Sequence, residues 1–167
     1  MENYCRFILL IMEPIVRKAT LEDVPILLEF EQGLIKAERP MDPTIKEGNI
    51  SYYDVSEFIK NEDSTLYVVE LNHEIVASGY AKLKPDRHYL KHDKQGYLGF
   101  MFVPENYRGN GYNKLIMDAL IHWCKERNVY EIRLDVYDVN HSAIRAYEKA
   151  GFKKHLITMR LDLNDPS

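Results

Sequence analysis

Residues 103–114 read VPENYRGNGYNK, a proline-bearing turn that leads through two glycines into a pattern of helical spacing. An apolar run precedes it, and from about Gly109 apolar residues recur at positions 112, 115, 116, 119, 120 and 123. Backbone N–H groups at such a helix start point outward, with the positive end of the helix dipole behind them. Arg108 and Lys114 add positive charge. The stretch therefore predicts an anion site, with a purely structural turn as the alternative.

Two familiar phosphate-binding patterns do not fit this turn. A P-loop requires GxxxxGK followed by Ser or Thr, which the sequence lacks. A dinucleotide fingerprint requires GxGxxG, but Lys114 stands where the third glycine belongs. The turn also comes late in the chain, without an opening βαβ unit. Both nucleotide-binding patterns are therefore poor fits.

Composition limits the classes of partner. The chain has 167 residues and a net charge of −4, so we expect one globular domain without bulk attraction to nucleic acid or to a membrane surface. Residues 7–12 form an apolar run too short for a signal-peptide core or a membrane span, and two cysteines are too few for a disulfide framework. We expect a cytoplasmic protein. Residues 1–11 read as an N-terminal extension, with Met12 an alternative start of the domain at 12–167.

The hydrophobic periodicity predicts alternating helices and strands. Asn72 and His73 form a two-residue turn between two alternating runs, which favours an antiparallel hairpin. The predicted strands are 14–19, 65–71, 74–83, 96–103, 131–137 and 152–161, and the predicted helices are 21–36, 53–61, one from about 109, and 140–150.

Three segments together resemble the GCN5-related N-acetyltransferase (GNAT) superfamily. VPENYRGNGYNKLIMDAL resembles its acetyl-CoA motif, Q/R-x-x-G-x-G/A; NHSAIRAYEKAGF resembles its second signature; and IVRKATLEDVPILLEF resembles its first strand and helix. The resemblance implies an α/β (α+β) fold with a mixed, mostly antiparallel central sheet flanked by helices and splayed at the central parallel strand pair. It also implies an acetyl-CoA-dependent N-acetyltransferase that acetylates a primary amine directly, in a ternary complex.

The resemblance also implies a set of site residues. One group would bind the pantetheine arm and the pyrophosphate: Met101, Phe102, Val103, Arg108, Gly109, Asn110, Gly111, Tyr112, Asn113, Lys114 and Asn140. Tyr147 would protonate the departing thiolate, although its spacing also fits a packed helix face. Asn140 equally fits an ordinary helix N-cap. Asn113 departs from the family pattern, which has Gly or Ala there, and this puts the affinity for the cofactor in doubt.

An ammonium acceptor must lose a proton before it can attack. Asp135 is the predicted base, and Glu31 and Glu70 are other candidates. The base could also act through a water molecule. The structural alternative for Asp135 is a surface ion pair, for instance with Arg133. Residues 21–63 carry 11 Asp or Glu against 4 Lys or Arg. That excess is either a solvated face or an attraction for a cationic acceptor.

The remaining reactive residues favour structural roles. His88 and His92 lack a third ligand, so no metal is expected, and Cys124 follows the buried stripe of a helix. The expected partner is a small-molecule or peptide amine, and a homodimer is left open. Two alternatives remain: a CoA-binding regulatory module without turnover, or a transferase with another acyl donor or acceptor.

Overall fold

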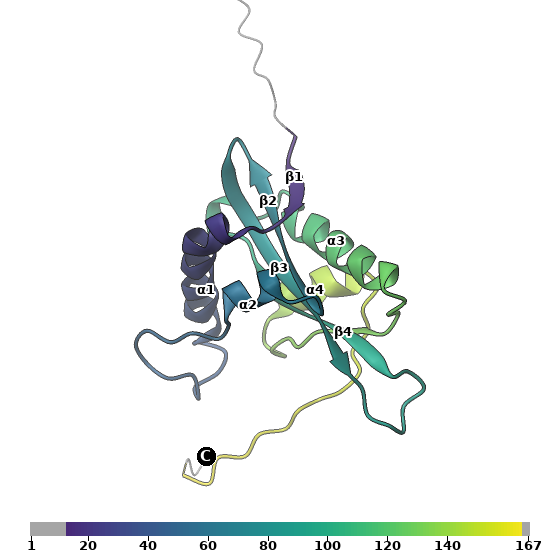
Figure 1. Cartoon of the computed structure of the whole chain (residues 1–167). Coiled ribbons are helices and arrows are strands. Elements are labelled where there is room, and N and C mark those ends of the chain that lie inside the picture. The colour runs from purple at the N-terminus through teal and green to yellow at the C-terminus, as the bar shows by residue number, and fades with distance from the viewer. Residues whose placement is uncertain (1–12, 165–167) are drawn as a thin grey trace, which may run out of the picture.

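The computed structural model describes residues 13–164, which build one five-stranded sheet in the order β1-β2-β3-β4-β5 with helices on both faces (Figure 1). The first three strand pairs are antiparallel and the β4–β5 pair is parallel. This confirms the predicted mixed sheet. The elements are β1 (Ile15–Lys18), η1 (Leu21–Asp23), α1 (Val24–Glu38), α2 (Val55–Lys60), β2 (Ser64–Leu71), β3 (Glu74–Pro85), β4 (Lys94–Phe102), η2 (Glu105–Tyr107), α3 (Tyr112–Glu126), β5 (Ile132–Arg133) and α4 (His141–Lys149).

Local sequence signals start the first helical segment and the hairpin as predicted. The backbone N–H of Thr20 donates to Oδ2 of Asp23 at 2.7 Å, as in a capping box. Asn72 and His73 both have positive φ, 52° and 65°, which is the twist that a two-residue hairpin turn requires. The predicted extension at residues 1–11 lies outside the described residues.

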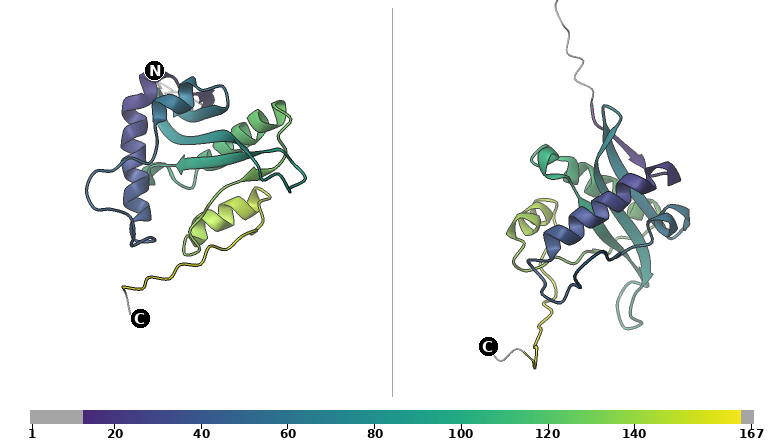
Figure 2. Two further views of the ribbon diagram at one scale, coloured as in Figure 1. Left: turned by 60° about the horizontal axis from the view of Figure 1, so that its bottom comes forward. Right: turned by 90° about the vertical axis from the view of Figure 1, so that its left-hand side faces the viewer.

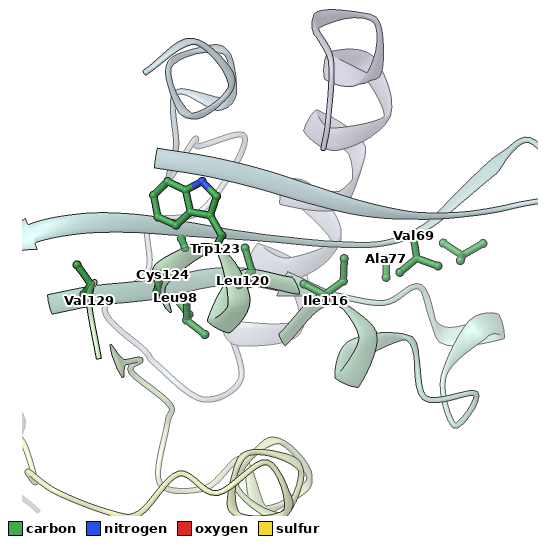
Figure 3. Packing of buried hydrophobic residues seen from close by; sticks show 10 residues of the cluster. Val69, Ala77, Leu98, Ile116, Leu120, Trp123, Cys124 and Val129 are labelled. Carbon is green, nitrogen blue, oxygen red and sulfur yellow. The ribbon is translucent and has the colours of Figure 1, made fainter. Parts of the chain in front are cut away.

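Two hydrophobic clusters sandwich the sheet. On one face α3 packs its buried stripe, which includes Ile116, Leu120 and Trp123, against β2, β3 and β4 (Figure 3). On the other face α1 and α2 cover an aromatic cluster around Tyr80 and Phe100. Figure 2 shows α1 running across the sheet on the face opposite α3. The two faces bury β4 from both sides, as its apolar sequence predicted.

A β-bulge in β4 changes which face its side chains enter. Tyr80 pairs with Gly99 while Ser78 pairs with Phe102, so β4 contains one extra residue at this point. Phe100 has φ 53°, in the left-handed region, and Oγ of Ser78 donates to its carbonyl oxygen at 3.3 Å. A Cβ on Gly99 would lie 2.7 Å from the Tyr80 ring, so this side of the bulge has room only for glycine. The bulge re-aims Met101 and the residues that follow it.

Two predicted strands differ from the structure. The strand predicted at 131–137 is regular only over Ile132–Arg133. The strand predicted at 152–161 is wrong: this segment has no regular structure and extends away from the sheet (Figures 1 and 2). Leu156, Ile157, Met159 and Leu161 are 79–86% exposed there. Alternating side chains favour a strand only where a neighbouring backbone is available, and none pairs with this segment within the described chain.

Candidate functional site

The parallel strands β4 and β5 pair briefly and then separate. Their register covers only Gly96 with Ile132 and Tyr97 with Arg133. Beyond Tyr97, the edge of β4 that faces β5 has no strand partner in residues 13–164. Met101, Phe102 and Val103, predicted to contact a pantetheine arm, are half-buried at this end of β4. The open edge offers N–H and C=O groups that an extended amide-containing ligand can pair with.

The turn before α3 presents unpaired backbone donors. Gly109 and Gly111 adopt φ 84° and 82°, a conformation that strongly favours glycine, and a Cβ on either would meet open space. Within residues 13–164, none of the N–H groups of residues 109–113 has a hydrogen-bond acceptor. The first N–H group of α3 that has an acceptor is that of Lys114, which donates to the carbonyl oxygen of Gly111 at 3.0 Å. Five successive donors at a helix N-terminus form an anion-binding surface.

Side chains around this turn brace it or remain exposed. Nε of Arg108 donates to the carbonyl oxygen of Val103 at 3.1 Å, which ties the turn to the end of β4. The amide of Asn110 donates to the carbonyl oxygen of Tyr107 at 3.0 Å. Lys114 forms an ion pair with Asp118 one helical turn later, where both are exposed. Asn113, the departure from the family pattern, is half-buried in the first turn of α3.

Asn140 caps the start of α4, and Tyr147 lies in the second half of the same helix. The side-chain oxygen of Asn140 accepts from the N–H of Ala143 at 3.2 Å and from the hydroxyl of Ser142 at 3.0 Å, so it is an N-cap. Tyr147 is half-buried, with its ring edge-on to Phe152 at 6.1 Å between centroids. Burial, and secondarily the charge of Glu38, raise the pKa of Tyr147 to about 12. Its phenol therefore remains protonated at neutral pH.

The predicted base lies across the β4–β5 opening from a tyrosine. The hydroxyl of Tyr97 donates to Oδ2 of Asp135 at 2.8 Å, and Asp135 is exposed. Arg133, considered as its ion-pair partner, instead pairs with Glu131 at 2.9 Å. Among the described residues, the Asp135 carboxylate therefore accepts one side-chain hydrogen bond, from the neutral hydroxyl of Tyr97.

The two other carboxylates considered as bases are engaged elsewhere. Glu31 is fully buried and accepts hydrogen bonds from the N–H groups of Tyr52 and Tyr53 and from the Ser51 hydroxyl, so it anchors the loop after α1. Glu70 lies on β2, two strands away from β4, and pairs with Arg17 at 2.7 Å. Both carboxylates therefore serve the fold.

Other reactive side chains also have structural partners. Nδ1 of His92 lies 2.9 Å from Asp86, and within residues 13–164 no three His, Cys, Asp or Glu side chains gather as metal ligands would. Burial raises the pKa of Cys124 to about 11, so this core thiol is protonated. No helix in the described range has the length and apolar character needed to span a membrane.

Sequence reasoning missed two residues of this region. Tyr97 lies on β4 within an apolar run, where its spacing indicated only packing. Glu38 ends α1, and its charge raises the pKa of Tyr147, which comes from α4. The general acidity of residues 21–63 was the available signal for Glu38, but it did not single out one carboxylate.

Comparisons with known proteins agree with this architecture. The acetyltransferase (GNAT) family matches residues 33–152, which is most of the chain. The chain belongs to this family. An N-alpha-acetyltransferase of Sulfurisphaera tokodaii is 29% identical over 147 residues, covering 83% of this chain and 80% of that protein.

Solved structures share the fold over almost their whole length. A mutant of the BH1408 protein from Bacillus halodurans is 28% identical, with a TM-score of 0.80 over 89% of this chain and 99% of that one. A predicted acetyltransferase from Clostridium acetobutylicum, solved with acetyl-CoA, is 23% identical with a TM-score of 0.69 over 91% and 97%. The second likeness concerns the fold alone.

Proposed function

We propose that the chain is an acetyl-CoA-dependent N-acetyltransferase that acetylates a primary amine directly, in a ternary complex. One observation carries this proposal: the five unpaired N–H groups of residues 109–113 at the start of α3. The pyrophosphate of the cofactor supplies the anion that such a surface binds. The name of the N-alpha-acetyltransferase from Sulfurisphaera tokodaii supports an α-amine as the acceptor, and membership of the acetyltransferase (GNAT) family supports an acetyl donor.

Each remaining predicted site residue then has a role in binding. Met101, Phe102 and Val103 pair with the pantetheine arm along the open edge of β4. The amide nitrogen of Asn140 is available to the same arm, because its oxygen is used in capping α4. Residues 108–114 surround the pyrophosphate, and Asn113 adds a side-chain amide where the family has Gly or Ala.

The chemistry requires an ammonium acceptor to lose two protons, one before attack and one from the tetrahedral intermediate, while the sulfur gains one, finally from solvent. Asp135 takes the proton from the acceptor nitrogen, directly or through water, and the nitrogen lone pair forms the new C–N bond at the thioester carbonyl carbon. As the C–S bond breaks, its electron pair leaves with sulfur, and the hydroxyl of Tyr147 donates to the thiolate. A thiol has a pKa of about 8.5, so with the Tyr147 pKa near 12 a strong hydrogen bond is favoured over complete proton transfer.

A binding and a turnover experiment separate this proposal from its alternatives. Calorimetry would measure acetyl-CoA affinity, and release of free thiol would be followed with a panel of peptide and small-molecule amines. The proposal expects micromolar binding and acceptor-dependent thiol release in the cytoplasmic pH range. Binding without turnover on any amine would favour a regulatory module, turnover only with another acyl donor or acceptor would favour the second alternative, and absence of binding would reject all three. Whether the protein acts as a monomer or a homodimer is a separate measurement by light scattering.

A further inference from the structure

The segment that follows α4 has the side-chain pattern of a half-buried strand. Apolar and polar side chains alternate along residues 157–163, so an extended backbone places the apolar ones on one face and the polar ones on the other. The apolar face consists of Ile157, Met159, Leu161 and Leu163, which are 79–87% exposed. A continuous row of exposed apolar side chains is uncommon on a protein that works alone, so it indicates a contact surface.

The backbone of this segment is also unpaired. Within residues 13–164, no hydrogen bond joins the N–H and C=O groups of residues 153–163 to another part of the main chain. An extended chain in this condition is completed by the free edge of a sheet, which supplies both donors and acceptors. The segment therefore has the side chains and the free backbone groups of a strand that joins a sheet edge.

β5 offers such an edge. It is the last strand in the sheet order, so within the described chain its side away from β4 has no strand partner. The N–H groups of residues 134–136, which continue from β5, have no acceptor there either. Ile132 and Leu134 pack against the cluster beneath α3, while Val136, next in the same alternation, is 37% exposed. An apolar strand along this edge would extend the existing core.

The end of α4 directs the segment away from its own sheet. Gly151 has φ 98°, and its N–H donates to the carbonyl oxygen of Glu148 at 3.0 Å. The N–H of Phe152 donates to the carbonyl oxygen of Tyr147 at 3.0 Å. These two bonds form a Schellman motif, which sets the direction in which the chain leaves the helix. Residues 152–163 contain no glycine, proline or asparagine that would favour a reversal, and the segment runs outward (Figures 1 and 2).

α4 lacks a complete layer to pack on in the single chain. Its apolar residues share one face at helical spacing: Ala143, Ile144, Tyr147 and Ala150. Within residues 13–164, neither hydrophobic cluster includes a residue of this helix, and none of its residues is buried. A strand added beyond β5 would widen the sheet and give α4, which follows β5 in the chain, the layer that it lacks.

Charge favours the β5 edge as the place where the segment binds. Residues 131–139 contain three acidic residues and one basic residue, whereas residues 152–163 contain three basic residues and one acidic residue. The segment and the edge therefore attract each other, while two copies of the segment repel each other. A pairing of segment with segment is disfavoured for this reason.

We propose that two copies of the chain swap these segments, so that residues 152–163 of each copy pair as a strand with the free edge of β5 in the other. The swap is reciprocal, and a two-fold arrangement leaves neither copy with an unpaired segment or an unpaired β5 edge. The assembly therefore closes as a dimer. The swap uses the outer edge of β5 and leaves the opening between β4 and β5 free, so it is independent of the proposed function.

Light scattering over a range of protein concentrations tests the assembly. We expect the wild type to have twice the mass of one chain. Leu161→Lys places a charge on the apolar face and should give a monomer, whereas Thr158→Lys places the same charge on the polar face and should remain a dimer. Both side chains are exposed in the single chain, so neither change should disturb its fold. A wild type that is monomeric at every concentration, or a dimer that Leu161→Lys leaves intact, would overturn the proposal.

Amide hydrogen exchange tests whether the swapped strand makes the dimer. The N–H groups of residues 134–136 and 153–163 should exchange about a hundredfold more slowly in the wild-type dimer than in the Leu161→Lys monomer. Fast exchange of both stretches in a dimer would assign the contact to another surface and contradict the proposal. Slow exchange in a monomeric wild type would show that the segment pairs with the β5 edge of its own chain, which contradicts it equally.

Discussion

The hydroxyl of Tyr97 on β4 donates a 2.8 Å hydrogen bond to Oδ2 of Asp135, across the point where β4 and β5 separate. This bond fixes the orientation of the proposed base toward the opening. Asp135→Asn keeps an oxygen that accepts from Tyr97 but removes the carboxylate that takes a proton. We expect kcat to fall by about 10²–10⁴, the usual contribution of a general base, with the acetyl-CoA Kd unchanged.

Two companion variants control this measurement. Asp138→Asn changes an exposed carboxylate three residues further along and should leave kcat unaltered. Tyr97→Phe should lower kcat less than Asp135→Asn, because the base remains but loses its orienting bond. Wild-type kcat in Asp135→Asn would assign proton removal to water or to another group.

Gly111 and Gly48 form a matched pair for testing the anion site. Both have left-handed φ values, 82° and 81°, and a Cβ at either position meets open space. Replacement by Ala should cost each variant about 1–2 kcal/mol of folding stability, measured by urea unfolding. Only Gly111→Ala should also lose acetyl-CoA affinity, by about tenfold or more, because only Gly111 belongs to the row of free N–H groups. A similar loss in Gly48→Ala would indicate a general effect of destabilisation.

Tyr147→Phe tests the proposed donor to the departing sulfur. The variant should bind acetyl-CoA normally and turn over about 10²-fold more slowly. Since the pKa of Tyr147 is raised to about 12, the wild-type phenol stays protonated, and its role is lost only as pH rises through that value. Between pH 7 and 10, deprotonation of Tyr147 should therefore cause no fall in kcat. The wild type and Tyr147→Phe should have kcat profiles of the same shape over this range. Tyr130→Phe, which alters a 73% exposed tyrosine, is the control.

The ion pair of Arg17 and Asp23 makes the free energy of unfolding depend on pH at the acidic end. The two side chains lie 2.8 Å apart, and this contact holds the pKa of Asp23 below its usual value. A depressed carboxyl pKa stabilises the fold above the unfolded pKa, and the contribution is lost as pH falls through the folded pKa. Asp23→Asn should therefore lower the free energy of unfolding at pH 7, by about 3 kcal/mol, and this deficit should shrink as the pH falls below the unfolded pKa of the carboxyl. A deficit that stays equal as the pH falls would contradict the assigned charge effect.

The sequence predicted those parts of the fold that depend on local signals. The Asn72-His73 turn specified the hairpin, and Asn140 specified the start of α4, because turn and cap geometry follow from neighbouring residues. The family resemblance, supported by the family match over residues 33–152, added the expectation of a parallel pair that opens.

Features that depend on distant contacts could not be predicted in the same way. The bulge at Phe100 is stabilised by Ser78 on a neighbouring strand, and periodicity carries no sign of it. The charge of Glu38 at the end of α1 raises the pKa of Tyr147 on α4, and no local pattern indicates that these two distant segments come together. The pattern of residues 152–161 indicated a strand, but a strand also needs a backbone partner, which side-chain pattern does not provide.

The most direct test of the central claim is an amide NMR titration with CoA and with pantetheine, which lacks the pyrophosphate. We expect CoA to shift the N–H signals of residues 109–113 strongly, because these donors would bind the pyrophosphate. Pantetheine alone should shift signals of residues 101–103 and leave the turn unchanged. Unchanged signals at residues 109–113 in saturating CoA would contradict the account.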